Sequence, residues 1–87
     1  MDVLKIDIET FSSVDIAKAG LYKYAQSHDF EILLFAYSLN GSDVKVVDLA
    51  QGEKIPYEIS EKLNDGKTLL RAYNAAFEWY CLNRAGY

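Results

Sequence analysis

Two acidic residues near the N-terminus, Asp7 and Glu9, have types and spacing suited to binding a metal ion. They belong to the stretch from Val3 to Glu9, in which apolar and polar residues alternate from Leu4 onward. Such alternation predicts a β-strand whose successive side chains leave opposite faces. Asp7 and Glu9 then share a face, with their Cα atoms roughly 6.5 Å apart. Because hard cations such as Mg²⁺ and Mn²⁺ prefer carboxylate oxygens, both side chains could reach one ion.

A third acidic residue lies far along the chain, at the predicted start of a helix. The segment from Asn74 to Glu78 reads Asn-Ala-Ala-Phe-Glu. Asn74 is of the type that caps helices, and Glu78 falls in the first turn. A strand is predicted just before it, over 68–73. If that strand lies beside the first and parallel to it, Glu78 meets the end of the first strand, where open α/β sheets bind ligands. Two-metal phosphoryl-transfer sites use acidic residues that converge in this way from separate elements.

Each of these residues also has a plain structural interpretation. Asp7 and Glu9 could simply form the solvent face of a half-buried strand. Glu78 suits a helix N-terminus because of the helix dipole. Phe77 and Trp79 are of types that usually pack in a core. The case for chemistry therefore rests on the two acidic segments occurring in one chain.

The remaining pattern predicts a mixed α/β fold, with a mixed sheet and helices packed on it. The dipeptide Asn40-Gly41 predicts an antiparallel hairpin, and Ser13 is the expected cap of the first short helix. Besides the elements named above, the expected segments are a helix over 14–19, an irregular or weakly helical stretch over 21–29, strands over 30–39 and 44–49, and a helix over 56–64 in which Ile59 and Leu63 share a face.

Composition narrows the classes of function. The chain has 87 residues, 51% of them hydrophobic, and a net charge of −4, which describes one globular domain and argues against a basic nucleic-acid or membrane surface. Bound divalent cations could still reverse the local charge where a phosphate sits. A single cysteine, Cys81, and a single histidine, His28, exclude an internal disulfide and a Cys/His zinc site. We expect a cytoplasmic protein, with Cys81 in the core and His28 in a solvated loop.

At the level of motifs the sequence resembles a known family. Asp7-Ile8-Glu9-Thr10 followed by Asn74-Ala75-Ala76-Phe77-Glu78 is similar to the first two exonuclease motifs of the DEDD superfamily of 3′–5′ exonucleases, which share the ribonuclease-H-like fold. The similarity extends over essentially the whole chain and is nearest to the N-terminal proofreading domain of family A DNA polymerases from phages and prophages. It implies metal-dependent hydrolysis at the 3′ end of single-stranded DNA.

The resemblance also implies roles for individual residues. Asp7 and Glu9 would bind catalytic Mg²⁺ or Mn²⁺, with Asp7 bridging two ions. Glu78 would hold the second ion, at a position where the superfamily usually has Asp. Thr10 would touch the terminal nucleotide, and Asn74 and Phe77 would position the 3′ end.

The superfamily has a third motif, a Tyr or His followed by Asp on a later helix, for which no candidate follows Glu78. We therefore expect residues 1–87 to form the N-terminal part of such an exonuclease domain, with little or no nuclease activity alone. A truncated sheet would also leave apolar surface or an edge through which the chain could self-associate.

One rival interpretation is a small non-catalytic module that binds a partner or a nucleic-acid end. Another is a glycosidase with two catalytic acids, for which the surrounding sequence lacks a sugar-binding aromatic cluster.

Overall fold

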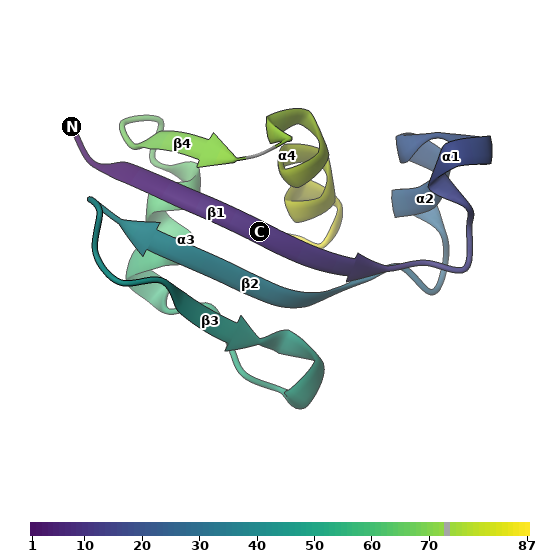
Figure 1. The fold of residues 1–87 in the computed structure, drawn as a ribbon, viewed down its shortest axis with the longest axis horizontal. Coiled ribbons are helices and arrows are strands. Elements are labelled where there is room, and N and C mark those ends of the chain that lie inside the picture. Colours follow the sequence, from purple (N-terminus) through teal and green to yellow (C-terminus); the bar gives the residue numbers. More distant parts are fainter. Residues whose placement is uncertain (73) are drawn as a thin grey trace.

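Strand β1 (Val3–Phe11) is the central element of the fold, because it contacts both neighbouring strands and the helices (Figure 1). The structure is a computed structural model and describes residues 1–72 and 74–87. Leu4, Ile6 and Ile8 are buried on one face of β1, whereas Asp7 and Glu9 are exposed on the other. The alternation predicted from the sequence is confirmed.

The elements follow the expected order. Beyond β1 they are α1 (Ile16–Ala19), α2 (Leu21–Gln26), β2 (Glu31–Leu39), β3 (Lys45–Asp48), the 3-10 helix η1 (Leu49–Gln51), α3 (Tyr57–Asn64), β4 (Leu69–Ala72) and α4 (Ala75–Arg84). Tyr73, which was expected to close the fourth strand, lies outside the described residues. The stretch after Gly20 is a helix, one of the two alternatives left open by the sequence.

The four strands form one mixed sheet in the order β3-β2-β1-β4. β1 is antiparallel to β2 and parallel to β4, and β2 and β3 are antiparallel. Asn40 and Gly41 turn the chain between β2 and β3 with φ values of 53° and 76°. Positive φ at both positions is what a type I′ hairpin requires, and Asn-Gly adopts it most readily. The predicted mixed sheet and its hairpin are therefore confirmed.

The start of the first helix differs from the prediction. Helix α1 begins at Ile16, and its cap is Asp15, whose Oδ1 accepts a hydrogen bond from the Ala17 N–H at 2.9 Å. Ser13 lies two residues before the cap, too far from the first residue of α1 to occupy that position. Its N–H instead donates to both carboxylate oxygens of Asp29, each at 3.2 Å, which joins the two ends of the segment between β1 and β2.

The core lies on one face of the sheet, beneath α3 and α4, which Figure 1 shows behind β1. Ile59 of α3 and Cys81 and Leu82 of α4 are buried with the apolar face of β1. The expected core position of Cys81 is confirmed. The same expectation is wrong for Trp79, which lines an open cavity between α4, α3 and β4 and remains 63% exposed.

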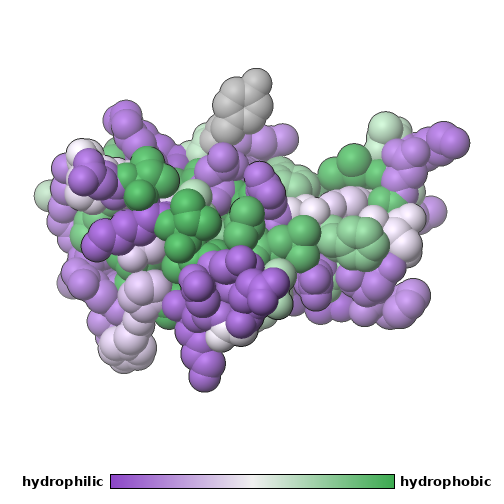
Figure 2. Space-filling view, turned by 60° about the horizontal axis from the view of Figure 1, so that its bottom comes forward, coloured by the Kyte–Doolittle hydropathy of each residue, from purple (hydrophilic) through white to green (hydrophobic). Residues whose placement is uncertain are grey.

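The opposite face of the sheet and its two edges carry exposed hydrophobic residues. Val46 on edge strand β3 is 58% exposed, and Leu69 on edge strand β4 is 41% exposed. Figure 2 shows hydrophobic residues gathered across the middle of one side of the molecule. Self-association through such surface stays a prediction. Of the helices within residues 1–72 and 74–87, none has the length and apolar character needed to cross a bilayer.

Candidate metal and 3′-end site

Asp7 follows the part of β1 whose parallel pairing with β4 is described. That pairing runs from Val3 opposite Leu69 to Ile6 opposite Ala72. Asp7 therefore lies near the carboxyl end of β4. This is the kind of location at which open α/β sheets bind ligands, because the strand end and the start of the next helix leave a crevice.

Asp7 and Glu9 leave the uncovered face of β1 and are both exposed. Their antiparallel partners on β2 are Ala36 and Leu34, which carry no charge. Directly after Glu9 the register shifts, since Glu9 pairs with Leu34 but Thr10 pairs with Ile32. A bulge of this kind changes the direction of the side chains that follow it and is common next to functional sites.

Glu78 is presented by the first turn of α4. The side chain of Asn74 caps this helix by accepting a hydrogen bond from the Phe77 N–H at 3.3 Å, as the sequence predicts. Glu78 is only 4% exposed. Its Oε2 atom is buried and has no hydrogen-bond partner within the described residues. A buried acidic oxygen without a donor is costly, so this group needs an explanation.

The electrostatic setting of Glu78 is unfavourable to its charge. Burial raises the pKa of its carboxyl above the ordinary 4.5, and the negative charge of Asp7 raises it further, while backbone N–H groups of Glu78 and Asn74 act in the opposite direction. Asp7 exerts this effect from the exposed face of β1, whereas Glu78 is buried on the side of the sheet covered by α4. A divalent cation between carboxylates removes such repulsion and supplies a partner for the unpaired oxygen.

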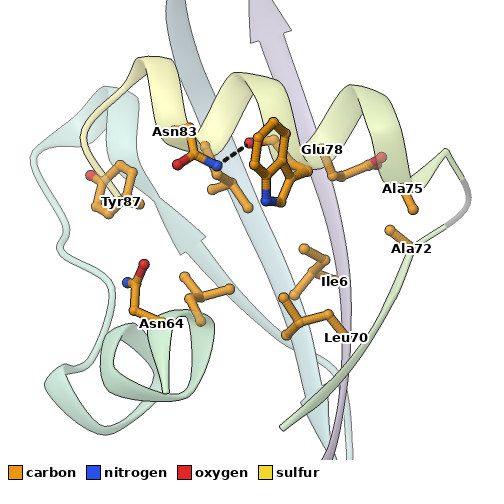
Figure 3. Close-up of a pocket in the computed structure, with 11 residues that line it drawn as sticks. Ile6, Asn64, Leu70, Ala72, Ala75, Glu78, Asn83 and Tyr87 are labelled. Atoms are coloured by element: carbon orange, nitrogen blue, oxygen red, sulfur yellow. Dashed lines mark hydrogen bonds between the residues drawn. The ribbon is translucent and has the colours of Figure 1, made fainter. Parts of the chain in front are cut away.

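A cavity of about 160 Å³ lies beside Glu78, between α4, α3 and β4 (Figure 3). Its wall is mostly apolar and includes Ile6, Leu70 and Ala72. In Figure 3 the Glu78 side chain points along α4 toward Ala75, so it borders one end of this cavity rather than its middle.

Thr10 and Phe77 are linked through Tyr24 of α2. The Tyr24 hydroxyl lies 2.8 Å from Thr10 Oγ1, within a hydrogen bond in which either oxygen could donate. The Tyr24 ring lies 6.4 Å from the Phe77 ring, centre to centre, and 6.0 Å from the Phe30 ring. The structure thus brings two predicted nucleotide contacts, far apart in the sequence, to one aromatic side chain.

Not all of the predicted ligands converge. Within the described residues, no three His, Cys, Asp or Glu side chains form a group able to hold one ion. Asp7 and Glu9 are exposed on one face of β1, whereas Glu78 is buried, and the charge of Asp7 acts only to raise the pKa of Glu78. Binding of an ion by these acidic residues therefore stays a prediction.

Sequence reasoning gave no role to Tyr24, because it falls in a stretch without clear periodicity. The signal that could have indicated it is the density of aromatic residues from Tyr22 to Phe30.

Cys81 is fully buried, and burial raises the pKa of its thiol to about 11. Such a thiol is a poor nucleophile, in agreement with its predicted core role. His28 is exposed in the turn before β2.

Comparison with known proteins bears on the larger protein rather than on the site. The chain is 54% identical over 82 residues to a DNA polymerase of Bacillus phage SP02. The chain is similar to part of a phage polymerase. The match covers 94% of this chain but only 13% of that polymerase. No protein-family model matches the chain, and no solved structure matches it.

Proposed function

We propose that this chain forms part of a metal-dependent 3′–5′ exonuclease domain of a phage-type DNA polymerase, with the ribonuclease-H-like fold. The observation that carries the proposal is the buried carboxyl of Glu78 on the first turn of α4, whose Oε2 has no hydrogen-bond partner within the described residues and whose pKa is raised by burial and by the charge of Asp7. The similarity to a phage DNA polymerase supports the polymerase context. The parallel placement of β4 beside β1 supports the fold.

The acidic residues would serve as ligands. Asp7, Glu9 and Glu78 would hold Mg²⁺ or Mn²⁺, with Asp7 central because it is adjacent in sequence to the end of the parallel ladder and electrostatically coupled to Glu78. When bound, such ions lower the pKa of a water molecule and stabilise negative charge on a leaving 3′ oxygen. In that chemistry no side chain of the protein needs to be the nucleophile.

The substrate would be the 3′ end of single-stranded DNA. Thr10 and Phe77 lie on either side of Tyr24, and Asn74 fixes the helix start that carries Phe77 and Glu78. With a net charge of −4 and an acidic site, the chain has no general attraction for a phosphate backbone. Binding of the scissile phosphate would therefore depend on the cations. Hydrolysis would take place in the cytoplasm of a bacterial host.

The proposal is tested by titrating Mn²⁺ into the 87-residue chain and following the amide resonances. Paramagnetic broadening centred on Asp7, Glu9 and Glu78 is expected, and it should be lost in an Asp7→Asn variant. Asp43→Asn, at an exposed acidic residue outside the site, is the matched control and should keep the broadening. No broadening at millimolar Mn²⁺, or broadening confined to other regions, would contradict the metal site. That result would favour a module that binds a partner or a nucleic-acid end without catalysis.

Exonuclease activity is to be measured on a complete polymerase that carries these residues, whereas metal binding can be measured on the chain itself.

A further inference from the structure

Helix α2 contacts β1 and α4 through side chains that have no part in the proposed metal site. It has six residues, of which Ala25 is fully buried in the core and Leu21 is packed against it. Polar and aromatic side chains add further contacts, among them a hydrogen bond from the Gln26 amide to the Tyr80 hydroxyl at 2.9 Å. The Tyr22 ring packs edge to face on the Tyr80 ring of α4 at 4.7 Å, and Tyr24 reaches both β1 and α4.

We propose that Tyr24 is a positioning residue that holds Thr10 and Phe77 in the geometry needed to receive the last nucleotide of a DNA 3′ end. This inference rests on the proposed function and deepens it. Its basis is the hydrogen bond between the Tyr24 hydroxyl and Thr10 Oγ1 at 2.8 Å, together with the packing of the same ring beside Phe77. No other side chain in the described hydrogen bonds and ring pairs contacts both of these residues.

The hydroxyl of Tyr24 controls what Thr10 can offer to a ligand. A Thr hydroxyl has one proton and two lone pairs. When the phenol donates to Thr10 Oγ1, the Thr10 proton is free to donate to an acceptor such as a phosphate or sugar oxygen. Thr10 lies directly after the register shift between β1 and β2, where Leu33 of β2 is left without a partner on β1. A second restraint from Tyr24 therefore fixes the direction of its hydroxyl.

The ring of Tyr24 controls Phe77 separately. Phe77 is half-buried, and Tyr24 lies between it and Phe30, tilted by 41° to the first ring and by 75° to the second. Aromatic pairs at such distances hold one another in place beyond their burial alone. An aromatic side chain held this way offers a base a sequence-independent surface. Tyr24 would thus act on the base through Phe77 and on the backbone of the nucleotide through Thr10.

Two substitutions separate the hydroxyl from the ring. In the complete polymerase, Tyr24→Phe should raise KM for a single-stranded 3′ end roughly fivefold, the equivalent of one hydrogen bond, and leave kcat nearly unchanged. Tyr24→Leu should raise KM further because Phe77 loses its neighbour. Tyr22→Phe, on the same helix and with its ring contact to Tyr80 kept, is the matched control and should leave KM unchanged.

A readout that does not depend on activity comes from the 87-residue chain. In Tyr24→Phe, the three-bond couplings that report the χ1 angle of Thr10 should change from a single rotamer toward an average, while the Thr10 couplings stay unchanged in Tyr22→Phe. Unchanged KM and an unchanged Thr10 rotamer in Tyr24→Phe would overturn this inference alone, provided that the wild-type enzyme degrades 3′ ends in an Asp7-dependent manner. A wild-type enzyme without Asp7-dependent degradation would overturn the proposed function and this inference with it.

Discussion

Ile6 lies opposite Ala72 in the parallel ladder between β1 and β4, and an acidic residue follows each of them along the chain. Asp7 comes directly after Ile6 on the exposed face of β1, and the first turn of α4, after Ala72, carries Glu78. The negative charge of Asp7 adds to burial in raising the pKa of Glu78.

The buried carboxyl of Glu78 should reduce stability at neutral pH. Its folded-state pKa is raised above 4.5 by burial and by Asp7, so the free energy of unfolding should fall as pH rises from about 4.5 through the folded pKa. Glu78→Gln should therefore melt at a higher temperature than wild type at pH 7 and at a similar temperature at pH 4, as followed by circular dichroism. Glu9→Gln, at an exposed position, should change little. A Glu78→Gln variant that is less stable than wild type at pH 7 would show that the charge is compensated.

Asp29 should stabilise the segment between β1 and β2, which contains α1 and α2, in a pH-dependent way. Hydrogen bonds from the Ser27 hydroxyl and from Ser13 lower the pKa of its carboxyl from 3.8 to about 2. Because the folded pKa is depressed, this contribution is complete above about pH 4 and is lost as pH falls toward 2. Asp29→Asn should lower the urea midpoint at pH 7, with a smaller difference at pH 2. Asp43→Asn is the control, and an equal effect of both substitutions would contradict the role of Asp29.

The Asn74 cap of α4 should make a measurable contribution to the free energy of unfolding. Asn74→Ala removes the acceptor of the Phe77 N–H and should cost about 1 kcal/mol, or roughly 4–8 °C in Tm for a domain of this size. Asn74→Ser keeps a capping oxygen and should retain most of the stability. Thermal denaturation of both variants checks this expectation, and an equal loss in the two would mean that Asn74 contributes through something other than the cap.

Cys81 should react slowly with alkylating reagents in the folded chain. A rise of its thiol pKa from 9.0 to about 11 reduces the thiolate fraction at pH 8 about a hundredfold, and the side chain is fully buried. Iodoacetamide labelling followed by mass spectrometry should be at least this much slower in buffer than in concentrated urea. Comparable rates in the two conditions would place the thiol at the surface.

The strands and the two longer helices could be predicted because local sequence determines each of them, through the spacing of apolar residues and through turn and capping residues. Leu4, Ile6 and Ile8 alternate with polar residues, Asn40-Gly41 permits the positive φ values of a tight hairpin, and Asn74 caps α4. The parallel neighbour of β1 was inferred only conditionally, since strand order depends on packing between distant segments. The structure supplies that order directly.

The parts that sequence could not predict depend on tertiary contacts. Ser13 and Asp15 are both of types that cap helices, and Asp15 is the residue that accepts from the Ala17 N–H, while the Ser13 N–H binds the distant Asp29. Trp79 is of a type that usually packs in a core but remains exposed beside an open cavity. Tyr24 joins Thr10 to Phe77 across three elements, a relationship that no local spacing reveals.

The most direct test of the account is the degradation of 3′-labelled single-stranded DNA by a complete polymerase that carries these residues, measured with Mg²⁺ beside primer extension by the same preparation. Asp7→Ala should reduce degradation to background and leave extension at the wild-type rate, whereas Asp43→Ala should leave both unchanged. Degradation by Asp7→Ala at the wild-type rate would contradict the assignment of Asp7, and with it the proposed exonuclease site.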